Sequence, residues 1–147
     1  MLPRENNLAH PETNRYVLDS YALLAYLEGE KGGTRVREFL KRAARQKCKL
    51  FMSIVNLGEA LYIVEREKGL SETQDALSCV GELPIAVVDA DSRLTFAAAH
   101  IKAHYPIAYA DCFAIALTQI ERASLITGDP EFKRAHIDDF LPIVWLD

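Results

Sequence analysis

Short apolar segments alternate with longer amphipathic ones along most of this chain, and this alternation is the strongest constraint on its fold. Each apolar segment is too short for a helix and is apolar on both faces. This pattern is typical of strands in a parallel sheet whose two faces are covered by helices. The sequence therefore predicts an α/β domain with a buried parallel sheet. The expected strands cover Tyr16–Asp19, Leu50–Met52, Ile85–Val88, Leu125–Thr127 and Ile143–Trp145.

The segments between the strands carry start and stop signals of helices. Thr34 and Ser53 are expected to cap two of them, and Gly69 follows the last turn of the second. Ser71 with Gln74 forms the capping-box pattern at the start of another helix. The expected helices cover Ser20–Glu28, Thr34–Gln46, Ser53–Lys68, Ser71–Gly81, Asp91–His104 and Ala108–Arg122.

Length and composition predict a single domain. The chain has 147 residues, of which 50% are hydrophobic and 26% charged, close to the average for globular proteins. Its apolar runs are interrupted by polar residues and are shorter than the roughly 20 residues of a membrane span. We expect Met1–Asn14, which is polar and has no signal-like apolar segment, to extend outside a domain of residues 15–147. With three widely spaced cysteines that we expect to be reduced, the prediction is a cytoplasmic protein.

Four carboxylates stand alone in otherwise apolar stretches, where a charge is costly unless it is paired, hydrogen-bonded or bound to a cation. They are Asp19, Glu59, Asp111 and Asp129. Asp19 and Asp129 lie at or just after the ends of expected strands, where ligand sites form in open parallel sheets. Asp111 lies in the first turn of its helix, and Glu59 shares a helix face with Asn56. We therefore expect the four side chains to meet at one edge of the sheet.

Clustered carboxylates repel one another, and a bound divalent cation relieves that repulsion. Oxygen-only ligands suit Mg²⁺ or Mn²⁺, whereas zinc sites usually include thiolate or imidazole groups. A cation held in this way activates water and stabilises the charge that develops during phosphoryl displacement. The four acids therefore predict metal-dependent hydrolysis of a phosphodiester.

The stretches that contain these acids resemble the successive motifs of PIN-domain ribonucleases, especially VapC-type toxins. They read YVLDSYALLAYLEGE, SIVNLGEALY, YPIAYADCFAIALT and SLITGDPEF. The resemblance extends from Tyr16 to Trp145 and implies a single domain whose five-stranded parallel sheet is flanked by helices. It also implies Mg²⁺- or Mn²⁺-dependent cleavage of RNA, and a homodimer held by a VapB-like antitoxin.

On this resemblance, the four acids are the catalytic, metal-binding residues. Ser20 and Thr127 match polar positions that support them, and Asn56 on the helix face of Glu59 is a third supporting side chain. Helix capping offers another explanation for single acids. Asp19 could cap the helix that follows it, Asp111 could interact with a helix dipole, and Asp129 before Pro130 is typical of a turn. Capping can account for single acids but not for the set of four, so we interpret the set as metal ligands.

Positive charge is concentrated in one segment, although the formal net charge is −4. Residues 31–49 contain eight basic residues and one acidic residue, and a helix there places most of them on its outer face. We interpret this face as a contact for the RNA backbone. A dimer or antitoxin interface and a solvated face are the alternatives. The residues assigned to RNA are Arg35, Arg37, Lys41, Arg42 and Arg45.

Two other functions are compatible with the sequence. One is a PIN-like housekeeping nuclease without an antitoxin; a neighbouring short reading frame for a DNA-binding protein would favour the toxin instead. The other is a non-catalytic domain that binds RNA or a protein partner and whose acids are structural. Weak or absent binding of Mn²⁺ would favour this second alternative.

Overall fold

The protein is an α/β domain built on one parallel sheet. The computed structural model describes residues 14–146, so the predicted extension lies, except for Asn14, outside the described residues. The sheet has five strands in the order β3-β2-β1-β4-β5, and every neighbouring pair is parallel. This confirms the predicted five-stranded parallel sheet. The strands are β1 (Arg15–Leu18), β2 (Lys49–Ser53), β3 (Ile85–Val88), β4 (Ser124–Thr127) and β5 (Ile143–Trp145).

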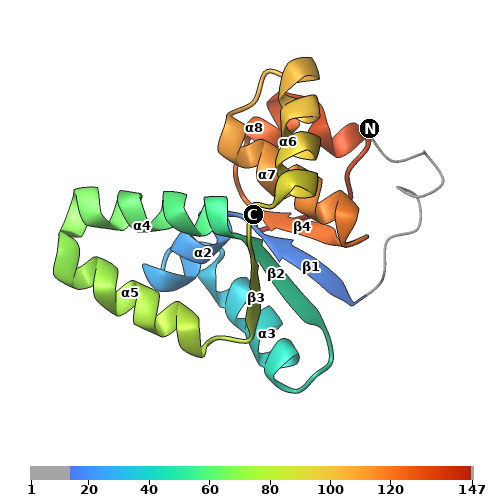
Figure 1. The fold of residues 1–147 in the computed structure, drawn as a ribbon. Helices are drawn as coiled ribbons and strands as arrows, with labels where there is room; N and C mark the ends of the chain where they lie inside the picture. The colour runs from blue at the N-terminus through green and yellow to red at the C-terminus, as the bar shows by residue number, and fades with distance from the viewer. Residues whose placement is uncertain (1–13, 147) are drawn as a thin grey trace.

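Helices cover both faces of the sheet (Figure 1). One face packs on α6, α7 and α8 through a core that includes Val17, Leu125 and Phe132. The other face packs on α2 and α3 through Leu18, Leu50 and Ile126. The helical segments are α2 (Ser20–Leu27), α3 (Gly33–Ala44), α4 (Ile54–Lys68), α5 (Leu70–Glu82), α6 (Ser92–His104), α7 (Tyr109–Ile120), α8 (Glu131–Arg134) and the 3₁₀ turn η1 (Ile137–Asp139).

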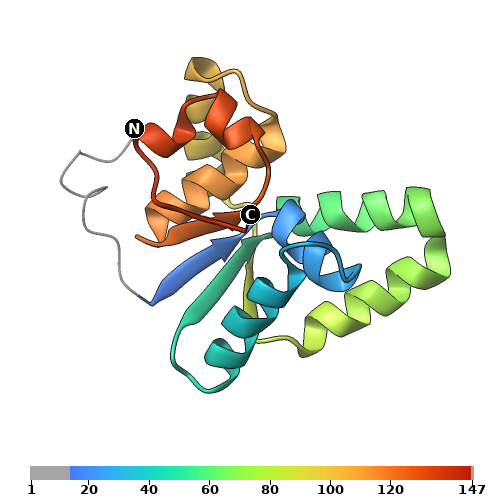
Figure 2. The ribbon, with the colours of Figure 1, turned by 180° about the vertical axis from the view of Figure 1, so that it is seen from behind.

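Helices α4 and α5 form an antiparallel hairpin that extends away from the sheet, as the rear view shows (Figure 2). Its inner side packs against α2 through Leu23, Leu57 and Val80. No helix among the described residues is long and apolar enough to cross a membrane. The edge strand β3 is less buried than predicted, because Ala86 and Val87 in its middle are exposed.

Two predicted helix caps are wrong. Helix α3 begins at Gly33 after Gly32, so Thr34 lies inside its first turn and caps nothing. A Cβ atom at residue 33 would lie 2.4 Å from the carbonyl oxygen of Ala25, and this close approach of α2 and α3 fixes the start of the helix. Helix α5 begins at Leu70 after Gly69, one residue before Ser71. There the Thr73 hydroxyl donates to the Gly69 carbonyl at 3.0 Å in place of the predicted capping box.

The carboxyl ends of the parallel strands meet along one side of the sheet, which we call the carboxyl edge. Residues that follow β1 and β4 emerge there side by side, because these two strands are neighbours in the sheet although 105 residues or more separate them in sequence. Helix α7 packs against β1, β2 and β4. The opposite side, which we call the amino edge, holds the first residues of each strand.

Candidate functional site

Asp19 is the most buried acid of the carboxyl edge, with 1% of its surface exposed. It follows β1 in an extended conformation and caps α2, because its Oδ1 accepts from the Ala22 amide at 2.9 Å. Its Oδ2 accepts from the Thr127 hydroxyl at 2.5 Å. The capping role considered from the sequence is therefore present, and it uses only one of the two carboxylate oxygens.

Glu59 and Asn56 extend from α4 toward the starts of two other helices. The Ser20 hydroxyl, at the first residue of α2, donates to Glu59 Oε1 at 2.5 Å. Asn56 is fully buried, and its Nδ2 donates to the Ala110 carbonyl of α7 at 3.0 Å. Its Oδ1 is buried without a hydrogen-bond partner. Such an orphaned acceptor beside Asp111 is costly in a folded protein unless it has a ligand.

Asp111 lies in the first turn of α7 and is 7% exposed. Burial, together with the negative charges of Asp129, Glu59 and Glu131, raises its pKa to about 7. Glu131 was not predicted from the sequence. Its position two residues after Asp129, in the first turn of a short helix, is the only local signal that could have identified it.

Asp129 follows β4 and is half-buried in a tight turn. Its Oδ1 accepts from the Glu131 amide at 2.9 Å, and its own amide donates to the Thr127 hydroxyl at 3.0 Å. This is the turn geometry considered as an alternative for Asp129. A Cβ atom at Gly128 would lie 2.4 Å from the ring of Tyr21, so glycine is required for the turn to approach α2.

The four acids influence one another electrostatically even where they share no hydrogen bond. The pKa of Asp19 is raised to about 7, mainly by burial. The hydrogen bonds from Thr127 and Ala22 oppose this shift, while the charges of Asp111 and Asp129 add to it. The carboxyl edge therefore holds carboxylates that are unstable in their charged form at neutral pH without a counter-charge.

The residues present fit an oxygen-ligated divalent cation. In the metal-free arrangement, no three acidic, histidine or cysteine side chains of residues 14–146 lie close enough together to hold an ion. The available donors are carboxylate oxygens and the unpartnered Asn56 Oδ1, and this donor chemistry suits Mg²⁺ or Mn²⁺.

The five basic residues predicted to bind RNA do not all lie at the carboxyl edge. Helix α3 runs antiparallel to the strands, since Arg35 at its start donates to the carbonyl of Trp145, the last residue of β5. Arg42, near its end, stacks on Tyr16 in the first half of β1. Ten residues of helix separate Arg35 from Arg45, or about 15 Å. Arg35 therefore lies at the carboxyl edge, and Arg42 and Arg45 lie toward the amino edge.

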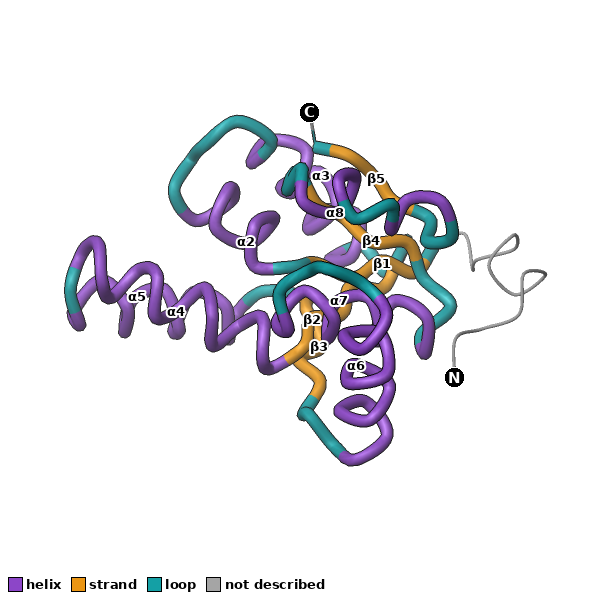
Figure 3. Tube along the Cα trace, turned by 90° about the horizontal axis from the view of Figure 1, so that it is seen from above, coloured by secondary structure: helices purple, strands orange, loops and turns teal. Residues whose placement is uncertain are grey.

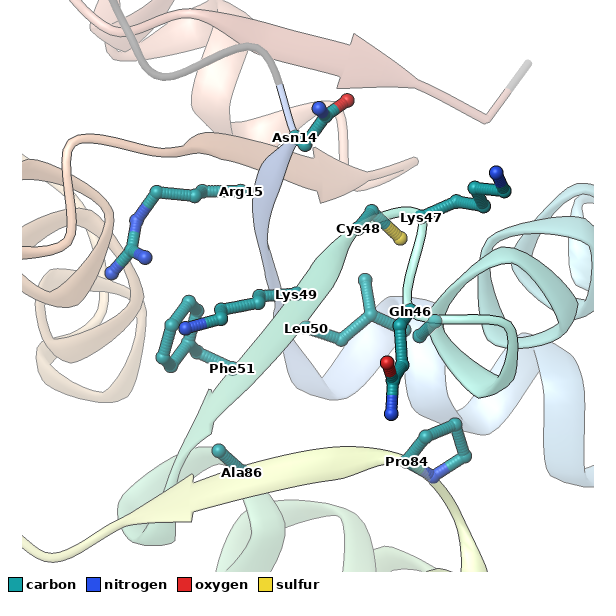
Figure 4. A pocket seen from close by; sticks show the side chains of 11 residues that line it. Asn14, Arg15, Gln46, Lys47, Cys48, Lys49, Leu50, Phe51, Pro84 and Ala86 are labelled. Carbon is teal, nitrogen blue, oxygen red and sulfur yellow. The ribbon is translucent and has the colours of Figure 1, made fainter.

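The amino edge carries a pocket of about 740 Å³ far from the acids in the sheet (Figure 4). Its polar lining comes from Asn14, Arg15, Gln46, Lys47 and Lys49, and its floor from β2. The Arg15 guanidinium is already neutralised, because it forms an ion pair with Glu121 and lies 4.8 Å from the centroid of the Phe51 ring.

Comparison with solved structures finds proteins of similar fold. The VapBC2 complex of Rickettsia felis bound to a promoter DNA fragment matches with a TM-score of 0.70 and 19% identity, over 90% of this chain and 99% of that chain. VapC20 of Mycobacterium tuberculosis, a toxin that cleaves the sarcin-ricin loop, matches with a TM-score of 0.65 and 14% identity, over 82% and 94%. DNA-bound VapBC of Salmonella typhimurium matches with a TM-score of 0.66 and 17% identity, over 90% and 98%.

The family comparison covers nearly the whole described domain. No curated protein sequence is significantly similar to this chain. The sequence profile of the PIN domain, however, matches residues 16–137, which include all four acids and every strand except β5. The chain therefore belongs to the PIN domain family.

Proposed function

We propose that this protein is a metal-dependent endoribonuclease that hydrolyses RNA phosphodiester bonds at the carboxyl edge. The observation that carries the proposal is the pair of buried carboxyls, Asp19 and Asp111, whose pKa values are both raised to about 7 by burial and by neighbouring acids. A divalent cation removes this cost, and metal-dependent nucleases use such a cation at the scissile phosphate. The PIN family assignment of residues 16–137 supports the same chemistry.

Asp19, Glu59, Asp111 and Asp129 would hold Mg²⁺ or Mn²⁺ through the carboxylate lone pairs that their hydrogen bonds leave unused. When bound, the cation activates water and stabilises the charge of the displacement. Thr127 and Ser20 position two of the ligands, because their hydroxyls donate to Asp19 and Glu59. Asn56 connects α4 to the start of α7 and so fixes the position of Asp111. These three side chains orient carboxylates that would otherwise turn away from one another.

We assign the protein the biological role of a VapC-like toxin. The support is its structural likeness to the VapBC complexes of Rickettsia felis and Salmonella typhimurium, which contain the partner antitoxin. The proposal includes a VapB-like antitoxin, a homodimer and action in the cytoplasm, where RNA substrates are found. Production of the protein in a bacterial host should stop growth, whereas the Asp19→Asn variant should not.

The basic face of α3 is proposed to bind the RNA backbone. Arg35, Arg37, Lys41 and Arg45 are exposed on that helix, and Arg42 is half-buried against Phe39 and Tyr16. Arg35 contributes at the carboxyl edge, and the other four would contact more distant phosphates. For binding to single-stranded RNA, each phosphate contact that is removed should reduce the slope of log affinity against log salt by about 0.7.

Cleavage of total cellular RNA tests the nuclease proposal. The purified protein should produce discrete fragments with Mn²⁺ or Mg²⁺ and none with EDTA. Asp19→Asn should produce none, because it removes a ligand charge while preserving side-chain shape. Asp75→Asn is the matched control, since Asp75 is exposed on α5. Equal cleavage by wild type and Asp19→Asn would contradict the proposal.

The competing function is a non-catalytic binding domain. The observation that favours it is that Asp19 and Asp129 each satisfy local backbone amides, as structural acids do. A domain of that kind should bind single-stranded RNA or a protein partner without cleaving RNA under any metal condition. It should also show no saturable binding of Mn²⁺, which separates the two functions.

A further inference from the structure

Trp145 lies at the carboxyl edge, one strand beyond the proposed catalytic acids. It is the last residue of β5 and pairs in register with Thr127 of β4. The Thr127 hydroxyl in turn donates to Asp19. Figure 3 shows β5 at the outside of the sheet, beside β4. Trp145 therefore lies one strand beyond Thr127, on the β4 side of the acids.

Two cationic side chains from opposite faces of the sheet converge on Trp145. Arg35 of α3 donates from Nη1 to the Trp145 carbonyl at 2.7 Å. Lys133 of α8 places its Nζ 5.3 Å from the centroid of the Trp145 ring. The first contact fixes a guanidinium on the side of α3, and the second holds an ammonium on the side of α8. One residue thus orients two positive charges.

These two charges are not neutralised by the described part of the chain. Among residues 14–146, the ion pairs are Arg15–Glu121, Arg134–Glu131 and His136–Asp139, so neither Arg35 nor Lys133 is paired with a carboxylate. Both side chains are exposed. The contrast with Arg134 is informative, since it is the next residue after Lys133 and pairs with Glu131 of its own helix.

A polyanion explains this arrangement better than structural packing does. Here two exposed cations are held at one residue by an aromatic ring and a carbonyl, which leave their charges available. A phosphodiester strand that enters a carboxylate site also meets local repulsion, and adjacent cations compensate for it. The half-buried Trp145 adds an aromatic ring of the kind that single-stranded RNA contacts.

We infer that Trp145, Lys133 and Arg35 form a binding site for single-stranded RNA phosphates, which we call the β5 clamp. Lys133 and Arg35 contact the phosphates that flank the scissile one, and Trp145 is a positioning residue that holds both cations. The inference deepens the proposed nuclease function and rests on it for the role of the neighbouring acids. It concerns RNA binding, which is measurable without cleavage.

The test measures binding of a fluorescein-labelled, unstructured oligouridylate in EDTA by fluorescence anisotropy over a range of salt concentrations. Lys133→Gln and Arg35→Gln should each weaken binding several-fold and reduce the slope of log affinity against log salt by about 0.7. Lys68→Gln is the matched control, since Lys68 is exposed at the end of α4 on the projecting hairpin. Slopes for all three variants equal to that of wild type would overturn the clamp.

The fluorescence of Trp145 provides a second readout. RNA binding would not change this emission if Trp145 had only a structural role. It is the single tryptophan of the chain, so intrinsic emission reports on this site alone. Unlabelled oligouridylate should change the emission of wild type and of Lys68→Gln in proportion to occupancy. Trp145→Phe should retain most of the salt slope and Trp145→Leu should lose part of it. RNA binding that leaves the emission of Trp145 unchanged would overturn the inference.

Failure of the clamp is distinguishable from failure of the nuclease. If wild type and Lys133→Gln cleave RNA equally with Mn²⁺ and also bind it equally in EDTA, the nuclease survives and the clamp is wrong. If no protein cleaves RNA but the lysine and arginine variants lose the predicted slope, the clamp survives and the proposed chemistry is wrong.

Discussion

Charged side chains are stabilised at the amino edge of the sheet and destabilised at its carboxyl edge. At the amino edge, Arg15 is paired with Glu121 and stacked on Phe51, and Arg42 lies over the rings of Tyr16 and Phe39. At the carboxyl edge, Asp19 and Asp111 are buried beside other acids, with pKa values raised to about 7.

This difference separates a region that stabilises the fold from a region that acts on a ligand. Arg15 at the amino edge has satisfied its interactions within the chain, so it has little free energy left to gain from a partner. The carboxyl-edge acids carry an unfavourable free energy that a cation would remove. Strained electrostatics of this kind is typical of functional sites.

The largest predicted effect is loss of cleavage at the carboxyl edge. Asp111→Asn should reduce metal-dependent RNA cleavage by about 100-fold or more, because a ligand to the cation is lost. Arg15→Gln at the amino edge should cleave RNA at the wild-type rate. Initial rates at saturating Mn²⁺ measure both, and a comparable loss in the two variants would remove the functional distinction between the edges.

A smaller effect is expected from the hydroxyls that orient the acids. Thr127→Val preserves shape but removes the donor to Asp19 Oδ2 and the acceptor for the Asp129 amide. It should lower activity or metal affinity by about 10- to 100-fold. Thr118→Val is the control, since the Thr118 hydroxyl bonds only to the Ala114 carbonyl within α7. Equal kinetics for the two variants would contradict a positioning role for Thr127.

The raised pKa values also predict how stability depends on pH. The folded-state pKa of Asp19 lies above its unfolded value of 3.8, so the metal-free folded protein binds more protons than the unfolded chain between pH 4 and about 7. Its contribution to stability is therefore full below pH 4 and is lost as the pH rises through about 7. One pKa unit corresponds to about 1.4 kcal/mol. The Tm of a variant that lacks the Asp19 carboxyl should therefore differ from that of wild type by several degrees at pH 7.5.

Thermal unfolding in EDTA measures this effect against a variant that lacks the titrating group. Asp19→Asn should have a higher Tm than wild type at pH 7.5, and the advantage should shrink toward pH 4.5. An advantage that is independent of pH would mean that burial of the Asp19 charge is not its source. Addition of Mn²⁺ at pH 7.5 should raise the Tm of wild type more than that of Asp19→Asn.

The smallest effect belongs to the amino edge. Arg15→Gln removes a half-buried ion pair and a cation–π contact, which together should contribute about 1 kcal/mol to stability. Chemical denaturation measures it, and increasing the salt concentration should reduce the difference because the ion pair is screened. A change in RNA cleavage with unchanged stability would reverse the roles that we assign to the two edges.

The order of strands and helices was predictable because it depends on local periodicity. The caps at Thr34 and Ser71 were not: a contact between two helices sets the start of α3, and α5 begins one residue earlier than its capping pattern indicates. Gly33 approaches Ala25 of α2 too closely for any side chain, and that contact sets the start of α3.

The convergence of Asp19 and Asp129 followed from parallel topology, which places strand ends together. The β5 clamp could not be predicted, because Arg35 and Trp145 are 110 residues apart and meet only in the folded chain. The direction of α3 relative to the strands also could not be predicted from the sequence. A helical face groups Arg35 with Arg45, although the fold directs them to opposite edges.

Calorimetric titration of the metal-free protein with Mn²⁺ at pH 7.5 tests the central claim most directly. The carboxyl edge should bind Mn²⁺ saturably, Asp111→Asn should lose that binding, and Asp75→Asn should retain it. Absence of saturable binding in wild type, or equal binding in wild type and Asp111→Asn, would contradict the assignment of these acids to a cation.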